Sequence, residues 1–86
     1  MYKYDEMQLL TDDGFEIYNK ILKKVQKFLS QSGAFKLDNV INGVYGDSFL
    51  MLTSIDYMEK KLRILKIYNG NSTQERVYIK GDKYEQ

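Results

Sequence analysis

Hydrophobic residues recur at a helical period over the first third of the chain. From Phe15 to Ser30 they fall on one side of a helical wheel while lysines gather on the other. The apolar positions are Phe15, Tyr18, Ile21, Leu22, Val25, Phe28 and Leu29, and the lysines are Lys20, Lys23, Lys24 and Lys27. Thr11 supplies an N-cap ahead of two first-turn acids, and Gly33 suits the left-handed residue that closes a helix. We therefore predict an amphipathic helix between Thr11 and Gly33, with a solvated lysine face or, alternatively, a phosphate-binding one.

Two shorter helical patterns follow. Leu37, Val40, Ile41 and Val44 predict a short helix that ends at Tyr45–Gly46, and Asp47 or Ser48 then caps a third helix. One face of this third helix carries Met51, Leu52, Ile55, Met58 and Leu62, and the other carries Phe49, Leu50, Thr53, Tyr57 and Lys60. Helix, short helix, turn and helix is the order of a helix-turn-helix unit.

The end of the chain changes period. Residues 63–68 and 75–80 are rich in β-branched and aromatic residues, and residues 69–74 between them have the composition of a turn. This pattern predicts a β-hairpin, with Tyr68 and Tyr78, like Tyr18 earlier, at core-like positions. The apolar run 49–52 also suits a buried strand, so an alternative fold packs one helix on an antiparallel meander of residues 47–55, 62–69 and 75–80.

Length and composition narrow the class of protein. The 86 residues, 43% of them hydrophobic, predict one domain, with residues 1–10 as an N-terminal extension, 12–80 as the core and 81–86 as a tail. The chain has no Cys, His or Trp, which excludes disulfides, structural zinc sites and imidazole catalysis. No phosphate-binding loop, calcium loop or convergent carboxylate pair is present, so we predict a protein that is not an enzyme and has no metal and no cofactor.

Charge is unevenly distributed although the net charge is only +1. Residues 1–19 carry five acidic residues against one lysine, whereas residues 20–66 carry nine basic residues against four acidic ones. A basic middle is compatible with an anionic partner, and solubility explains it equally well. Residues 1–6 lack the basic and apolar runs of a secretory signal, and no segment is apolar enough to span a bilayer, so the expected location is cytoplasmic.

A helical unit whose third helix continues into a hairpin resembles the winged helix-turn-helix superfamily. The stretch from Ser54 to Leu62 and on through residues 76–79 looks like a recognition helix followed by its wing, with Ala34–Lys36 as the short additional strand. The resemblance covers about residues 12–80. One position departs from it, because members often place Gly after the Lys-Lys pair that ends the recognition helix, and this chain has Leu62 there.

The resemblance implies an α+β winged-helix protein that binds double-stranded DNA in a sequence-dependent way, as a transcription regulator or replication accessory factor, with a homodimer as the expected assembly. Helix 48–61 and wing 70–76 would contact the duplex. The implied contacts are Thr53, Tyr57 and Lys60 on the outward face, Ser54 and Lys61 on its flank, Asn71, Ser72, Thr73, Gln74 and Arg76 on the wing, and Lys36 at the second helix.

An alternative function rests on the same helix. Asp56 and Glu59 border the expected reading face and repel phosphate, while Phe49 and Leu50 would expose apolar surface there. Such a surface predicts a non-enzymatic protein-interaction module, a small regulator or inhibitor, that uses Phe49, Leu50 and Tyr57. Alternatively, Phe49 has no binding role and simply packs against the second helix or the wing.

Overall fold

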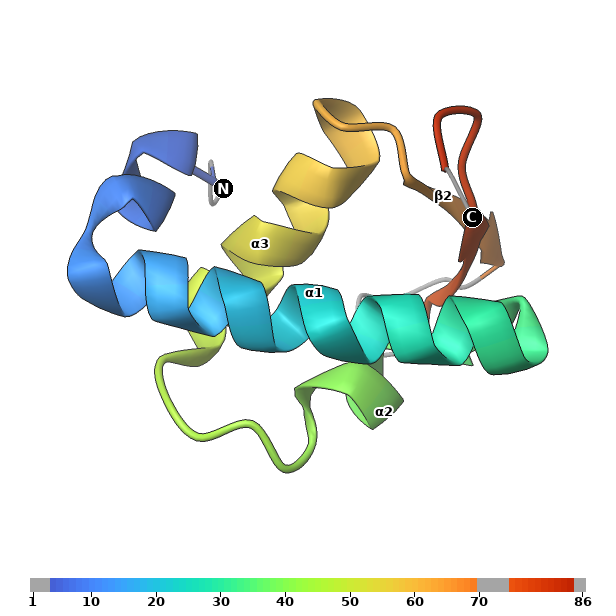
Figure 1. The fold of residues 1–86 in the computed structure, drawn as a ribbon, viewed down its shortest axis with the longest axis horizontal. Coiled ribbons are helices and arrows are strands. Elements are labelled where there is room, and N and C mark those ends of the chain that lie inside the picture. The colour runs from blue at the N-terminus through green and yellow to red at the C-terminus, as the bar shows by residue number, and fades with distance from the viewer. Residues whose placement is uncertain (1–3, 70–74, 85–86) are drawn as a thin grey trace.

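Helices and one antiparallel sheet make up the computed structural model, which describes residues 4–69 and 75–84 (Figure 1). In chain order the elements are the 3-10 helix η1 (Glu6–Leu10), α1 (Asp12–Ser32), β1 (Ala34–Lys36), α2 (Leu37–Ile41), α3 (Ser48–Lys60), β2 (Leu65–Asn69) and β3 (Val77–Lys80). The described residues thus form an α+β fold with three α-helices and a three-stranded antiparallel sheet. In Figure 1, α1 runs the length of the molecule, with α3 on one side, α2 on the other and the sheet at one end.

Both ends of α1 are where the sequence predicts them. The Thr11 hydroxyl accepts a hydrogen bond of 3.0 Å from the Gly14 N–H, and Gly33 closes the helix in the left-handed conformation with φ 74°. Its apolar stripe supplies Ile17, Ile21, Val25 and Leu29 to the core. Phe15 is an exception, because it is 60% exposed at the edge of this stripe, and its expected core position is wrong.

Residues 48–60 form a helix, so the meander alternative is wrong. The Asp47 carboxylate accepts a hydrogen bond of 2.8 Å from the Phe49 N–H and caps the first turn of α3, as predicted. This helix contacts α1, η1 and β2, which explains why apolar residues occur on more than one of its faces. A helix enclosed in this way lacks a clean amphipathic period, and its apolar run therefore looks like a strand in the sequence.

The sheet has the order β1-β3-β2, so the central strand is the one that comes last among the described residues. Phe35 of β1 lies opposite Tyr78 of β3, and their stacked ring centroids are 5.5 Å apart in the core. Tyr78 is 2% exposed, as its core-like position predicts, whereas Tyr68 is 70% exposed and that expectation is wrong. The cause is its place on the edge strand β2, whose residues after Leu65 are all exposed.

The turn from α3 into β2 shows how the chain turns without a glycine at position 62. The left-handed residue is Arg63, with φ 57°, and Leu62 is half-buried against the core. The segment after β3 holds this turn in place, because the Gly81 N–H donates to the Ile64 carbonyl and the Lys83 N–H to that of Arg63, both at 2.9 Å.

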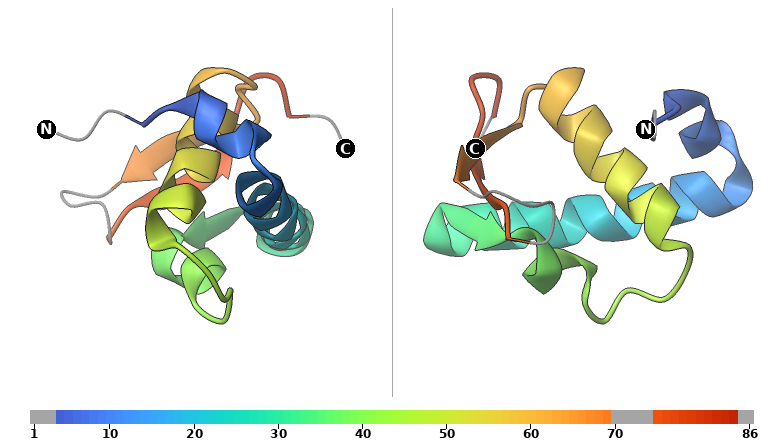
Figure 2. Two further views of the ribbon diagram at one scale, coloured as in Figure 1. Left: turned by 90° about the vertical axis from the view of Figure 1, so that its left-hand side faces the viewer. Right: turned by 180° about the vertical axis from the view of Figure 1, so that it is seen from behind.

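Residues 4–10, expected as an extension, pack onto the helices. Figure 2 shows this segment lying against α3 and the start of α1, and η1 contacts both helices. Leu9 is 7% exposed, and the backbone of η1 approaches Gly14 so closely that a Cβ there would lie 2.9 Å from the Leu9 Cα. The N-terminal segment is therefore a layer of the fold that covers part of α3.

Candidate functional site

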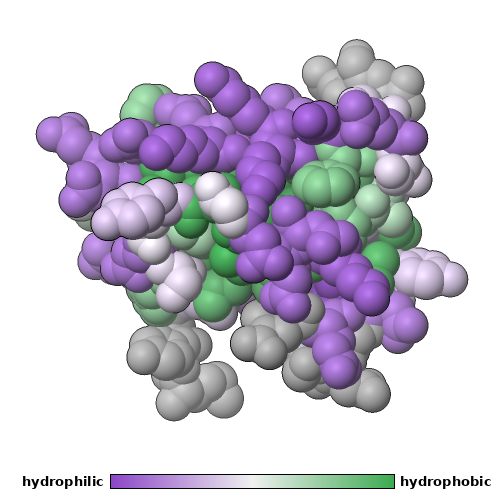
Figure 3. Space-filling model, turned by 90° about the horizontal axis from the view of Figure 1, so that it is seen from below, coloured by the Kyte–Doolittle hydropathy of each residue, from purple (hydrophilic) through white to green (hydrophobic). Residues whose placement is uncertain are grey.

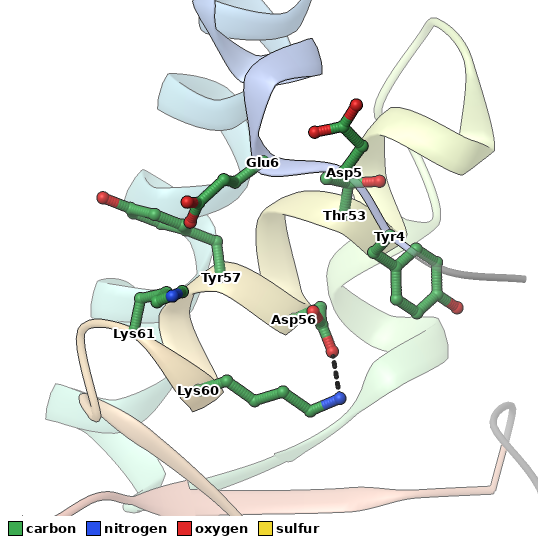
Figure 4. Close-up of a pocket in the computed structure, with 8 residues that line it drawn as sticks. All are labelled: Tyr4, Asp5, Glu6, Thr53, Asp56, Tyr57, Lys60 and Lys61. Atoms are coloured by element: carbon green, nitrogen blue, oxygen red, sulfur yellow. Dashed lines mark ion pairs between the residues drawn. The ribbon is translucent and has the colours of Figure 1, made fainter.

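The predicted reading face of α3 forms one wall of a pocket that the N-terminal segment closes from the other side. Figure 4 shows this segment crossing α3, with the Glu6 side chain directed toward Tyr57 and Lys61 and the Asp5 carboxylate, which caps η1, turned away from the helix. The pocket has a volume of about 280 Å³ and is lined by Tyr4, Asp5, Glu6, Thr53, Asp56, Tyr57, Lys60 and Lys61. A nucleic acid that entered the face of α3 would meet these N-terminal residues first.

Carboxylates balance the two lysines of this pocket. The Lys60 ammonium lies 2.9 Å from the Asp56 carboxylate one helical turn earlier (Figure 4), and this hydrogen-bonded pair raises the pKa of Lys60. Lys61 is exposed, and Asp5 and Glu6 line the same pocket. The face is therefore of mixed charge, whereas phosphate binding calls for an excess of cations.

Two of the predicted contact residues are buried, which corrects the outward position expected for Thr53 and the position on the flank expected for Ser54. Thr53 is 1% exposed and Ser54 is not exposed at all. Each hydroxyl donates a hydrogen bond of 2.8 Å to the backbone carbonyl four residues earlier, Thr53 to Phe49 and Ser54 to Leu50. With the hydroxyl protons used inside the helix, neither side chain presents a donor to a base or a phosphate.

The expected protein-binding patch on α3 is also covered. Leu50 is 8% exposed, so its predicted exposure is wrong. Phe49 is half-buried and its ring lies 5.6 Å from that of Tyr4, while the half-buried Tyr57 packs edge-on against Tyr18 at 6.0 Å. The sequence could not show this, because the residues that cover the patch are more than 30 positions away in the chain.

The wing side of α3 carries a second mixed-charge group. Arg76 is half-buried and its guanidinium hydrogen-bonds to the Tyr78 hydroxyl, which raises the pKa of Arg76. Glu59 lies nearby on α3, and partial burial raises the pKa of its carboxyl. Arg76 is thus held in the structure rather than extended toward solvent.

The remaining predicted contacts lie elsewhere. Lys36 is exposed at the N-cap position of α2, close to the start of that helix as expected. Asn71, Ser72, Thr73 and Gln74 lie outside the described residues.

The lysine face of α1 is exposed to solvent over most of its length. Lys23 and Lys27 are exposed, Lys20 forms an ion pair of 3.3 Å with Glu16, and Lys24 donates to the Asn42 carbonyl after α2. The face of the molecule on the α2 side is largely hydrophilic, and hydrophobic atoms show only in gaps between polar ones (Figure 3). These lysines therefore behave as a solvated helix face with local partners.

A groove between η1 and α1 is the feature that the sequence reasoning missed. We define the η1–α1 groove as the open depression of about 350 Å³ lined by Glu6, Met7, Leu9, Leu10, Phe15, Tyr18 and Tyr57. Met7, Leu10 and Phe15 are 65%, 78% and 60% exposed, and they are three of the six large hydrophobic residues that are exposed in the described part of the chain. The sequence held one indication of this groove, since Met7, Leu9 and Leu10 are apolar residues in an otherwise acidic segment.

The described residues contain no cluster of three His, Cys, Asp or Glu side chains that could hold a metal ion. Within the same residues, every helix is too short or too polar to cross a membrane. Comparison of the chain with protein-family models, curated proteins and solved structures found no match.

Proposed function

We propose that the protein is a protein-binding module and that the η1–α1 groove is where an apolar segment of another protein docks. The single observation that carries this proposal is the clustering of Met7, Leu10 and Phe15, each more than half exposed, around one depression. Contiguous exposed apolar surface beside a groove marks interaction sites, whereas isolated exposed hydrophobic residues are ordinary.

The energetics favour an anchoring role for these three side chains. Complete burial of one large apolar side chain contributes about 1.5–3 kcal/mol. The walls of the groove are already ordered, since Leu9 is buried and η1 is packed against α1 and α3. A prearranged groove lowers the ordering cost of binding.

The test uses a helical peptide with an apolar stripe of Leu and Phe at positions i, i+3, i+4 and i+7 and with Gln and Ala elsewhere. Titrated into the full ¹⁵N-labelled chain, it should shift the amide signals of residues 6–18 and few others. The double substitution Leu10→Ser/Phe15→Ser should abolish the response. Tyr45→Ser/Tyr68→Ser removes two aromatic rings elsewhere that are also more than half exposed, and as the matched control it should leave the response intact. Absence of shifts at the groove would refute the proposal.

Duplex DNA binding by a winged-helix domain is the second candidate function. The element order α1-β1-α2-α3-β2-β3 and the sheet order β1-β3-β2 favour it, because this layout is compatible with a winged helix. The protein would then serve as a transcription regulator or replication accessory factor. Of the contacts implied by the resemblance, Lys36, Lys60 and Lys61 are exposed.

A mixed-sequence duplex separates the two candidates. If α3 binds DNA, Lys60→Ala/Lys61→Ala should flatten the slope of log affinity against log salt by about two units. Lys23→Ala/Lys27→Ala, which removes two lysines from α1, is the control and should leave that slope unchanged. If the duplex leaves the α3 signals unchanged at low salt, this candidate is wrong.

A further inference from the structure

We infer that the partner segment of the η1–α1 groove is a basic amphipathic helix, with apolar side chains that fill the groove and Lys or Arg residues along its sides. This inference rests on the proposed function and specifies the chemistry of the partner. Two properties of the groove support the inference independently of its apolar residues. One is the charge of its rim, and the other is that its walls are helical.

The rim is acidic. The described residues 4–19 carry five carboxylates, all exposed, and neither Lys nor Arg: Asp5, Glu6, Asp12, Asp13 and Glu16. Of these five, only Glu16 forms an ion pair, with Lys20. The excess negative charge is therefore available to an incoming partner.

Two of these carboxylates flank the apolar anchors directly. Glu6 lines the groove on the η1 side. Asp12 is one turn ahead of Phe15 on α1, and residues three apart on a helix are surface neighbours. Lys60 and Lys61 of the α3 side line the adjacent pocket together with Glu6, and Lys60 is paired with Asp56. Lys or Arg side chains on both sides of the partner's apolar stripe would complement Glu6 and Asp12. Such charge complementarity steers the encounter of the two proteins and fixes the orientation of the bound helix.

The walls favour a helix over an extended strand as the occupant. Strand addition needs the exposed edge of a β-sheet, and the walls of this groove are helical segments, with no β-strand among the lining residues. An occupant must therefore bind through its side chains. An amphipathic helix presents two or three large apolar side chains on one face, one turn apart, and such a row of side chains fits into an apolar groove.

A second copy of this chain fits poorly. In a two-fold symmetric contact the same groove would meet itself, and both acidic rims would be brought together. The copy's basic surface, around Lys23 and Lys27 of α1, has no exposed large hydrophobic residue among residues 16–32 to serve as an anchor. The charge pattern therefore favours a different protein.

The experiment compares three peptides that share one apolar stripe and differ only at the flanking positions, which are Lys, Gln or Glu. With the full chain at about 0.01 M salt, the Lys peptide should bind at least about tenfold more tightly than the Gln peptide, and the Glu peptide should be the weakest. At about 1 M salt, where the Debye length falls to about 3 Å, the three affinities should converge. A Lys peptide with a central Pro, which breaks the helix, should lose most of its affinity.

Substitutions in the rim test the same inference from the protein side. Glu6→Gln/Asp12→Asn should weaken the Lys peptide several-fold and leave the Gln peptide unchanged. Asp38→Asn/Asp82→Asn removes the same charge from exposed positions on α2 and after β3, and as the matched control it should change neither. Amide spectra of both double variants should retain the dispersion of the parent.

The possible failures are distinguishable. Equal affinity for the Lys, Gln and Glu peptides at low salt, with groove signals perturbed by all three, would overturn the basic partner and leave the proposed function standing. Failure of every peptide to perturb the groove would overturn both. Tight binding of the Lys peptide to Leu10→Ser/Phe15→Ser would show attraction to the acidic surface without docking, and this too would overturn the inference.

Discussion

The packing of η1 against α1 can be tested at one residue, Gly14. Substitution by Ala places a methyl group against the backbone of η1, in collision with the Gln8 carbonyl and 2.9 Å from the Leu9 Cα. Both obstacles are backbone atoms, which a rotamer change cannot move aside. The helix η1 must therefore shift away from α1, and the Thr11 cap, which accepts from the Gly14 N–H, shifts with it.

The expected size of the effect follows from three contributions. Exposure of Leu9, now 7% exposed, costs about 2 kcal/mol, and weakening of the Thr11 cap costs up to about 1 kcal/mol. Replacement of Gly by Ala in a helix contributes up to about 1 kcal/mol in the opposite direction. We expect Gly14→Ala to lower the free energy of unfolding by roughly 2 kcal/mol.

Denaturant unfolding followed by circular dichroism measures this change directly. Gln26→Ala, at an exposed position in the middle of α1, is the control and should alter stability by no more than about 0.5 kcal/mol. The sign of the change in unfolding free energy is the decisive result, because helix propensity alone predicts that Gly14→Ala stabilises the protein. A rise in unfolding free energy would refute the close packing of η1, and with it the geometry of the η1–α1 groove.

Three further predictions concern the turn after α3 and the charges beside it. Arg63→Gly should raise the unfolding free energy by about 0.5–1 kcal/mol in denaturant titration, since Arg63 is left-handed at φ 57°, whereas Leu62→Gly should lower it because Leu62 packs on the core. Gly81→Ala should destabilise the protein by more than about 1 kcal/mol, because a Cβ there would lie 2.9 Å from the Leu65 backbone nitrogen, and an unchanged melting temperature would contradict that contact. Burial raises the pKa of Glu59 above its ordinary value of 4.5, so the folded state binds this proton more tightly than the unfolded state, and the stabilisation present at low pH is lost as the pH rises through the folded pKa. Stability curves of Glu59→Gln from pH 4 upward should therefore lack a downward step that the parent shows, and parallel curves would disprove the shift.

Local signals in the sequence were sufficient to predict most of the secondary structure. The caps at Thr11, Gly33 and Asp47 are short-range interactions, and each depends only on residue types within four positions of it. The β-branched and aromatic residues of β2 and β3 act over a similarly short range. These elements depend little on what packs against them, which is why they could be predicted.

The candidate site could not be predicted in the same way. Whether Thr53 faces solvent depends on Tyr4, Asp5 and Glu6, which line the same pocket and leave no periodic pattern in either segment. A helical wheel assumes one buried side, whereas α3 is enclosed by α1, η1 and β2. Gly14 was the best available hint, since a glycine in the first turn of a strong helix often marks a close approach of another segment.

The position of β3 at the centre of the sheet has a consequence for the order in which the chain folds. Both β1 and β2 bond only to β3 in the sheet, and β1 precedes β3 by about 40 residues of sequence. During synthesis on the ribosome, α1, β1, α2 and α3 all emerge while Phe35 still lacks the Tyr78 ring that stacks on it. The hairpin can form locally, but capture of β1 closes a long loop and completes the core in one late step. Until β3 has emerged, Phe35 and the edge strands β1 and β2 have no partner in the sheet.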